Sequence, residues 1–292
     1  MGAPMLASDA VSDETAYGRA FVLLVLMAAA TVAWLGLNLV FPGFQPTGIS
    51  QTVSRLTING AILAALWVGL SRAGFTGNRH LRIWLAVALP FTIWLIVVWW
   101  IALAGEFRAR PGIPPIPPAI FLPIILGLIV LLPSKRIGAV LDAIPPSWLV
   151  GLQLYRVLGG IFLVGWLQGQ IPGEFALPAG SGDALVGLLA LPVAYLLHRG
   201  APGAVALAIA WNALGVLDLV SAVTMGTLTQ PGPLQLIVPT VPNALLGTYP
   251  TVLIPAFAVP SSILLHALSL RQLRRRARAG ATRAPVEAAA LV

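Results

Sequence analysis

The chain has 292 residues, of which 58% are apolar and only 9% are charged. Soluble domains usually contain about 25% charged residues, so this composition excludes an ordinary soluble protein and predicts a polytopic membrane protein. The sequence contains no cysteine, which excludes disulfides and thiolate metal sites. The net charge of +8 is concentrated in short polar segments and in the tail after Leu270, which is typical of a membrane topology signal rather than of nucleic-acid binding.

Eight apolar stretches approach the roughly 20 residues that a helix needs to cross a bilayer. They predict an all-α bundle of about eight transmembrane helices at residues 20–41, 51–71, 83–104, 116–132, 147–167, 178–197, 204–225 and 248–269. This pattern divides the chain into four parts. They are a polar N-terminal segment (1–19), two helical halves of four spans each (20–132 and 147–269) and a basic tail (270–292).

The positions of Lys and Arg predict the orientation. Thirteen of these 17 residues lie in segments on the same side as the N-terminus, whereas only Arg108 and Arg110 lie in loops on the other side. Cytoplasmic loops carry an excess of Lys and Arg, so both termini are expected to be cytoplasmic. The expected location is the cell membrane, of the bacterial inner-membrane type. The expected partners are the lipid bilayer and anionic lipid headgroups at the basic tail, with no nucleic acid.

Polar residues inside the predicted spans mark the candidate site. A charge at the centre of a bilayer costs roughly 2.5–3.5 kcal/mol on insertion scales, so it indicates function by default. Asn212 and Asp218 share the small, polar face of their predicted helix, and Arg55 and Asn59 are four residues apart on another. We expect a polar cavity, open to the outside, that is formed by Arg55, Asn59, Arg156, Glu174, Asp183, Asn212 and Asp218.

These residues also have purely structural interpretations. Asp183 follows Pro178 closely, where a helix N-terminus would stabilise a carboxylate. Arg55 could extend its side chain to the outer headgroups. Arg156 and Asp218 could form a buried pair that only fixes how their helices pack.

Catalytic and metal-binding motifs point to no specific chemistry. Ser181 lies in a Gly-Ser-Gly segment near the predicted outer surface, whereas His198 and His266 lie at the predicted inner ends of their spans. A serine nucleophile needs a histidine within hydrogen-bond reach, so no catalytic residue is predicted. His198 and His266 are the candidates for a haem or metal site, but they also suit interfacial positions, and no metal or cofactor is predicted.

Three function classes remain open. The first is transport of a small solute or ion, coupled or not to protons, which is favoured by balanced charges within the spans and by a weak inverted repeat of residues 55–63 in 156–163. The second is an accessory or scaffold subunit of a larger membrane complex, with a membrane protein as partner. The third is a membrane-embedded enzyme or a protein that binds lipid or cofactor. The apolar, proline-interrupted loop 226–247 is either interfacial or re-entrant.

Overall fold

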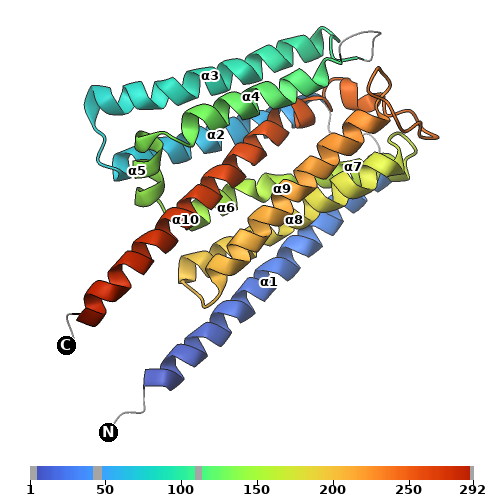
Figure 1. Cartoon of the computed structure of the whole chain (residues 1–292). Coiled ribbons are helices and arrows are strands. Elements are labelled where there is room, and N and C mark those ends of the chain that lie inside the picture. The colour runs from blue at the N-terminus through green and yellow to red at the C-terminus, as the bar shows by residue number, and fades with distance from the viewer. Residues whose placement is uncertain (1–4, 42–47, 109–113, 290–292) are drawn as a thin grey trace.

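The computed structural model describes residues 5–41, 48–108 and 114–289, and within these ranges the chain is a helical bundle without strands (Figure 1). The all-α prediction is confirmed. The long helices are α1 (Met5–Val40), α2 (Gly48–Arg72), α3 (Gly77–Leu103), α4 (Ile116–Leu131), α8 (Gly173–Arg199), α9 (Ala204–Thr229) and α10 (Val259–Ala289). The short helical segments are α5 (Lys135–Ala143), α6 (Pro146–Gly151), η2 (Leu152–Gly160), α7 (Ile161–Leu167), η3 (Leu245–Gly247) and η4 (Ile254–Ala258).

In the described part of the chain, seven helices are long and apolar enough to cross a membrane. Helices α4 and α5 meet at an angle of 84° and together are long and apolar enough for one broken span. If they are counted in this way, the number of candidate spans is eight. The new direction begins at Ser134, whose hydroxyl accepts a hydrogen bond from the backbone N–H of Ile137 at 3.3 Å. Such an N-cap stabilises the start of a separate helix.

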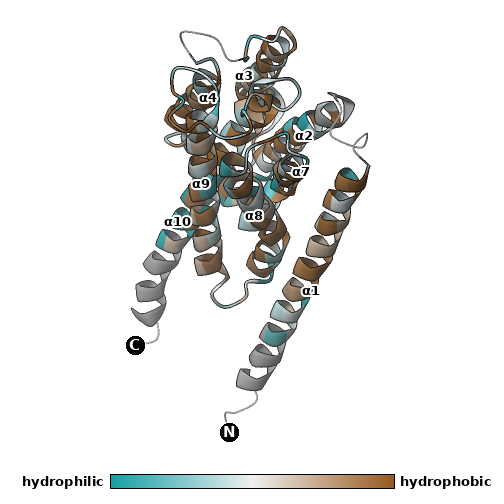
Figure 2. Cartoon of the chain, turned by 90° about the vertical axis from the view of Figure 1, so that its right-hand side faces the viewer, coloured by the Kyte–Doolittle hydropathy of each residue, from teal (hydrophilic) through white to brown (hydrophobic). Residues whose placement is uncertain are grey.

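The two ends of the described chain lie at the same end of the bundle, which we call the terminal end (Figure 1). The opposite end, which we call the loop end, carries the segment 230–253 between α9 and η4. Helix α8 packs against η2, α9, α1 and α6. Helix α1 stands at the edge of the bundle (Figure 2).

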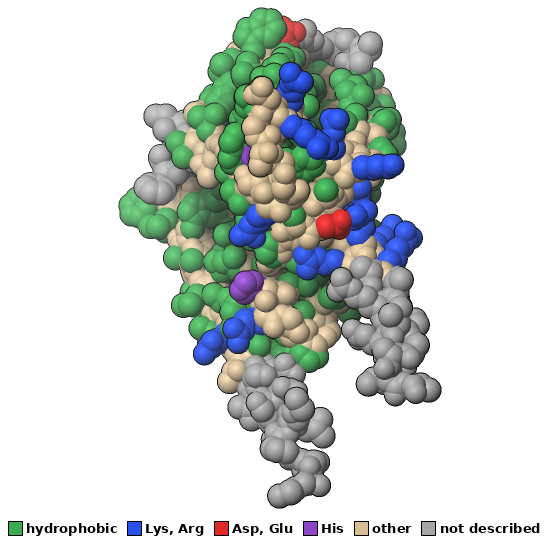
Figure 3. Space-filling view, turned by 90° about the vertical axis from the view of Figure 1, so that its left-hand side faces the viewer, with side chains coloured by type: hydrophobic (Ala, Val, Ile, Leu, Met, Phe, Trp, Pro, Cys, Tyr) green, Lys and Arg blue, Asp and Glu red, His purple; other side chains and the backbone are tan. Residues whose placement is uncertain are grey.

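Hydrophobic residues predominate along most of the helices (Figure 2), and many large ones are exposed on the surface of the bundle. The exposed fraction is 65% for Phe21, 69% for Trp100 and 66% for Leu217. Lys and Arg side chains gather on the face that includes the terminal end (Figure 3). The apolar residues therefore cover the sides of the bundle, while the basic residues concentrate toward one end.

Helix α8 begins earlier than the sequence suggested. Pro178 looked like the start of this helix, but the helix begins at Gly173, after Pro172, and Pro178 lies inside it. Pro178 is the sixth residue of the helix, so it lies beyond the first turn and lacks the N–H that would donate to the carbonyl of Glu174. Asp183 is consequently ten residues inside α8 rather than near its N-terminus, so the interpretation of this carboxylate as a helix-terminus residue is wrong.

The predicted span 147–167 is not one regular helix. It consists of α6, the 3₁₀ segment η2 and α7. The backbone of η2 lies unusually close to α8, since a Cβ atom on Gly187 would stand 2.3 Å from the backbone nitrogen of Val157. A 3₁₀ stretch within a longer helix often marks a hinge or a strained site.

The last predicted span, 248–269, is shifted toward the C-terminus in the structure. The helical region begins with the π-helical segment η4 at Ile254 and continues as α10 to Ala289. Pro260 has no N–H to donate to the carbonyl of Ala256, and the indole N–H of Trp94 donates to that carbonyl instead, at 3.1 Å. His266 therefore lies well inside the helix and not at its inner end as predicted.

Candidate functional site

Arg156 is the centre of the candidate site. Its side chain extends from η2 and the residue is 2% exposed. The guanidinium donates from Nε to Oδ1 of Asp183 on α8, at 2.7 Å, and from Nη2 to Oδ2 of Asp218 on α9. One arginine thus links three helical segments through two buried ion pairs.

His266 on α10 is the third side chain that contacts this guanidinium. Arg156 Nη1 lies 3.1 Å from His266 Nε2 and also donates to the backbone carbonyl of Gly215 at 3.2 Å. A guanidinium can only donate hydrogen bonds, so Nε2 of His266 must accept. The imidazole is therefore neutral, with its proton on Nδ1, which donates to Oδ1 of Asn212 at 2.9 Å.

Asn212 completes the network on its far side. Its Nδ2 donates to the carbonyl of Ala208 at 2.7 Å and to the hydroxyl of Ser269 at 3.1 Å. We call the five side chains joined in this way the Arg156 cluster: Arg156, Asp183, Asn212, Asp218 and His266. With both carboxylates ionised and the histidine neutral, the formal charge of the cluster is −1.

Glycines make room for the cluster. A Cβ atom on Gly182 would lie 1.7 Å from Oδ1 of Asp218, and one on Gly159 would lie 2.2 Å from Oδ2 of Asp183. A Cβ on Gly215 would lie 2.4 Å from the ring of His266. Real Cβ contacts are never this short, so each glycine is required where a helix backbone approaches a charged or polar side chain of a neighbouring helix.

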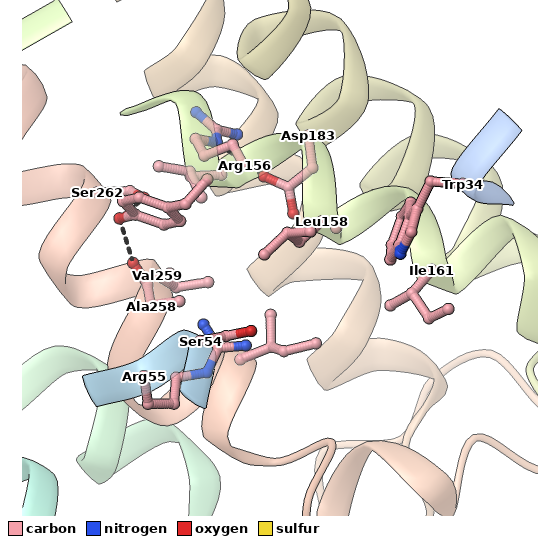
Figure 4. A pocket seen from close by; sticks show the side chains of 14 residues that line it. Trp34, Ser54, Arg55, Arg156, Leu158, Ile161, Asp183, Ala258, Val259 and Ser262 are labelled. Carbon is pink, nitrogen blue, oxygen red and sulfur yellow. Dashed lines mark hydrogen bonds and ion pairs between the residues drawn. The ribbon is translucent and has the colours of Figure 1, made fainter. Parts of the chain in front are cut away.

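Two small cavities meet at Asp183. The first has a volume of about 40 Å³ and is lined by Arg55 on the α2 side and by Asp183 on the α8 side (Figure 4). Tyr155 and Ser262, which share a hydrogen bond of 2.7 Å, also line it. The second, of about 30 Å³, extends toward the loop end, where Gln230 lines it. Each is large enough for water molecules.

The structure brings five of the seven predicted cavity residues together. Arg156, Asp183, Asn212 and Asp218 belong to the Arg156 cluster, and Arg55, which is 4% exposed, lines the first cavity. The other two, Asn59 and Glu174, lie elsewhere. The observed cavities are much narrower than the open polar cavity that we expected.

Asn59 and Glu174 have different surroundings from the cluster. Asn59 is buried between α2 and α3, where its Oδ1 accepts a hydrogen bond from the hydroxyl of Thr92 at 3.4 Å. Glu174 is exposed in the first turn of α8. The prediction that both line the same cavity as Arg156 is not supported by these positions.

Sequence reasoning missed His266 as a partner of Arg156. The signal was present as a polar stripe on α10, where Ser262, His266 and Ser269 follow one another at spacings of four and three residues, and all three are buried. This spacing places side chains on one face of a helix. Because the span was expected to end at residue 269, His266 was predicted to lie at its inner end rather than beside Arg156.

The two histidines considered for a metal or haem are not similarly placed. His266 is fully buried in the Arg156 cluster, whereas His198 is exposed at the end of α8. Within the described ranges, no group of three or more His, Cys, Asp or Glu side chains is arranged to hold a metal ion.

Comparison with known proteins gives one match. A family model described as Domain of unknown function (DUF8737) matches residues 113–274. No curated protein and no solved structure matches the chain. The matched region runs from α4 into α10 and contains all five residues of the Arg156 cluster, whereas Arg55 lies before it. The match covers more than half of the sequence, and the chain therefore belongs to this family, Domain of unknown function (DUF8737).

Proposed function

We propose that the protein is a multi-pass membrane protein whose Arg156 cluster couples the binding of a proton to the transport of a small solute or ion. The hydrophobic sides of the bundle support a membrane location, because large exposed side chains such as Phe21 and Leu217 would be unfavourable in water. Both ends of the described chain lie at one end of the bundle, as an even number of spans requires, with α4 counted as a crossing.

The orientation follows from the charge distribution. Lys and Arg gather toward the terminal end (Figure 3), and basic residues accumulate on the cytoplasmic side of membrane proteins. In our proposal the terminal end is therefore cytoplasmic, and the loop end, where the second cavity extends to Gln230, faces outward. The proposed location is the cell membrane, of the bacterial inner-membrane type.

The observation that carries the transport proposal is the position of Asp183. This carboxylate is paired with Arg156 and also lines both cavities. A buried ion pair contributes little to stability compared with apolar packing of similar size, so stabilisation of the fold alone is a poor explanation for this cluster. Charged residues in the interior of a bundle commonly form proton or ion pathways.

The charge balance suggests how the cluster works. One arginine faces two carboxylates, so a single bound proton brings the net charge of the cluster to zero. When Asp183 or Asp218 takes up that proton, its ion pair with Arg156 weakens and the guanidinium is held mainly by the other carboxylate. Because Arg156 lies on the irregular segment η2, this change of partner can shift η2 against α8 and α9. Such a shift would alternately open the site toward each end.

Proton flux into liposomes tests this proposal. The purified protein is reconstituted with a pH-sensitive dye inside the vesicles, and a potassium gradient with valinomycin supplies the driving force. Substrate mixtures of anions, cations and small neutral solutes are then added outside. We expect wild-type protein to acidify the lumen, and Asp183→Asn and Asp218→Asn to reduce the initial rate to that of empty vesicles.

Glu174→Gln is the matched control, because Glu174 is a carboxylate on the same helix as Asp183 but is exposed and outside the cluster. It should retain the wild-type rate. The proposal is wrong if Asp183→Asn and Asp218→Asn fold normally and carry protons as fast as Glu174→Gln.

A further inference from the structure

A second, larger opening lies on the side of the bundle, away from the Arg156 cluster. It is a groove of about 520 Å³ between α1, α2, α6 and α8, which we call the lateral groove. Its lining includes Leu23 on α1, Ala65 on α2, Trp148 on α6, Leu152 on η2, and Leu191 and His198 on α8. None of these residues belongs to the cluster or to the two small cavities.

The lining changes character along the groove. Ser147 and Trp148 lie at the beginning of α6, and Tyr195 and His198 lie in the last turns of α8, so the polar groups of both helices are at the terminal end. Deeper lining residues are apolar, including Leu152 at the start of η2 and Leu191 on α8. A ligand that fills the groove must therefore be polar at the terminal end and apolar beyond it.

Three arginines lie near the polar, terminal end of the lateral groove. The guanidinium of Arg72, at the last residue of α2, lies 4.6 Å from the ring centre of Trp148, which lines the groove. Arg199 directly follows His198 and is exposed. On α1, Arg19 lies one turn toward the terminal end from Leu23 and is also exposed. Arg72 thus contacts a residue of the groove, and Arg19 and Arg199 lie within one turn of lining residues on α1 and α8.

We propose that the lateral groove binds one anionic phospholipid. Its phosphate would lie beside Arg72 and His198, and one acyl chain would follow the apolar residues between α1 and α8. The inference rests on the proposed membrane location but not on the proposed proton coupling.

Quenching of Trp148 by brominated lipid tests the site. The protein is placed in nanodiscs that contain brominated phosphatidylglycerol or brominated phosphatidylcholine at equal, increasing mole fractions in unlabelled phosphatidylcholine. We expect brominated phosphatidylglycerol to quench a saturable component of the tryptophan fluorescence at lower mole fractions than brominated phosphatidylcholine does. This component should be absent from Trp148→Phe. Equal quenching by the two lipids, or the same saturable component in Trp148→Phe, would overturn the proposal.

Two arginine variants separate a specific site from general surface charge. Arg72 and Arg79 are both exposed, and each lies over an aromatic ring, but only the ring beside Arg72 lines the lateral groove. We expect Arg72→Gln to lower the preference for the anionic lipid about five-fold, corresponding to ~1 kcal/mol for one arginine near a headgroup. Arg79→Gln should leave it unchanged, and an equal loss in both variants would refute a defined site.

The lipid experiment can refute the lipid site without bearing on proton transport, and the flux experiment can refute proton transport without bearing on the lipid site. Lipid quenching needs no flux, so a wild-type protein without proton transport would leave the lipid result intact. If Arg72→Gln does not fold, the comparison of wild type with Trp148→Phe still decides the question.

Discussion

Two Arg–Asp sites in this molecule use the same chemical groups in opposite environments. In the Arg156 cluster, the side chains of Arg156 and Asp218 are 1% and 5% exposed. At the terminal end, Arg275 on α10 donates from both Nε and Nη2 to the two carboxylate oxygens of Asp142 on α5, and these side chains are 44% and 48% exposed. Both sites connect helical segments that are far apart in the sequence. They differ mainly in how much of the paired side chains is exposed to solvent.

Burial changes what each ion pair can do. Exposed pairs contribute at most about 1 kcal/mol, because water and salt screen the attraction. A buried pair has lost its hydration, so removing one partner leaves an uncompensated charge at a cost of roughly 3–5 kcal/mol. Loss of one charge from the cluster should therefore lower the stability of the protein strongly. The exposed pair should contribute only weakly to the packing of α5 against α10.

The largest effect is expected from Arg156→Leu. This change leaves Asp183 and Asp218 buried without their cation, and it should lower the free energy of unfolding by about 3–5 kcal/mol. Unfolding of the detergent-solubilised protein, followed by tryptophan fluorescence, measures the loss. Arg275→Leu is the matched control and should cost less than ~1 kcal/mol. Equal losses in the two variants would show that burial does not distinguish the sites.

His266→Leu should have the next largest effect. It removes the acceptor for Arg156 Nη1 and the donor to Asn212 Oδ1, and each buried group left unpaired costs about 1–3 kcal/mol. The same unfolding measurement applies, with His198→Leu as the exposed control. Nitrogen-15 NMR of wild-type imidazoles gives a second check, because we expect His266 to carry its proton on Nδ1. A doubly protonated His266 would contradict the hydrogen-bond pattern.

Much of this cluster could be predicted from the sequence. Arg156, Asp183 and Asp218 stood out because charges are rare in apolar stretches, and Asn212 was placed with Asp218 by helical spacing. These deductions need only the period of a helix and the cost of burying a charge. The all-α fold followed in the same way from the lengths of the apolar stretches.

The remaining features depend on contacts between helices, which the period of a single helix does not reveal. The predicted spans began at residues 178 and 248, but in the structure α8 begins at Gly173 and η4 at Ile254. These shifts moved Asp183 and His266 by several residues relative to the expected depth. The 3₁₀ segment that carries Arg156 lies in close contact with α8, and the sequence of this segment contains no pattern that predicts either feature.

Gly182→Ala tests how tightly the cluster is packed. The new methyl group would overlap Oδ1 of Asp218, which lies 1.7 Å from the ideal Cβ position. We expect a loss of about 1–3 kcal/mol, as for other overpacked interiors, together with reduced proton flux. Gly60→Ala is the matched control, because this exposed helical glycine has no neighbour within 4 Å and alanine favours the helix by up to ~1 kcal/mol. If both variants are neutral, the packing around Asp218 is looser than described.

The smallest effect is expected from Asp142→Asn at the exposed site. The hydrogen bond from Arg275 lowers the pKa of Asp142 below its ordinary value of 3.8. A carboxylate whose pKa is lower in the folded state stabilises the fold above its unfolded pKa, and the contribution disappears as the pH falls through the folded pKa. Asp142→Asn should therefore cost less than ~1 kcal/mol near neutral pH and nothing in strong acid. Melting temperatures of wild type and variant, measured from pH 7 downward, should begin to converge near pH 4 and should coincide once the pH is below the folded pKa of Asp142. A difference that persists in acid would assign the contribution of Asp142 to packing and not to its charge.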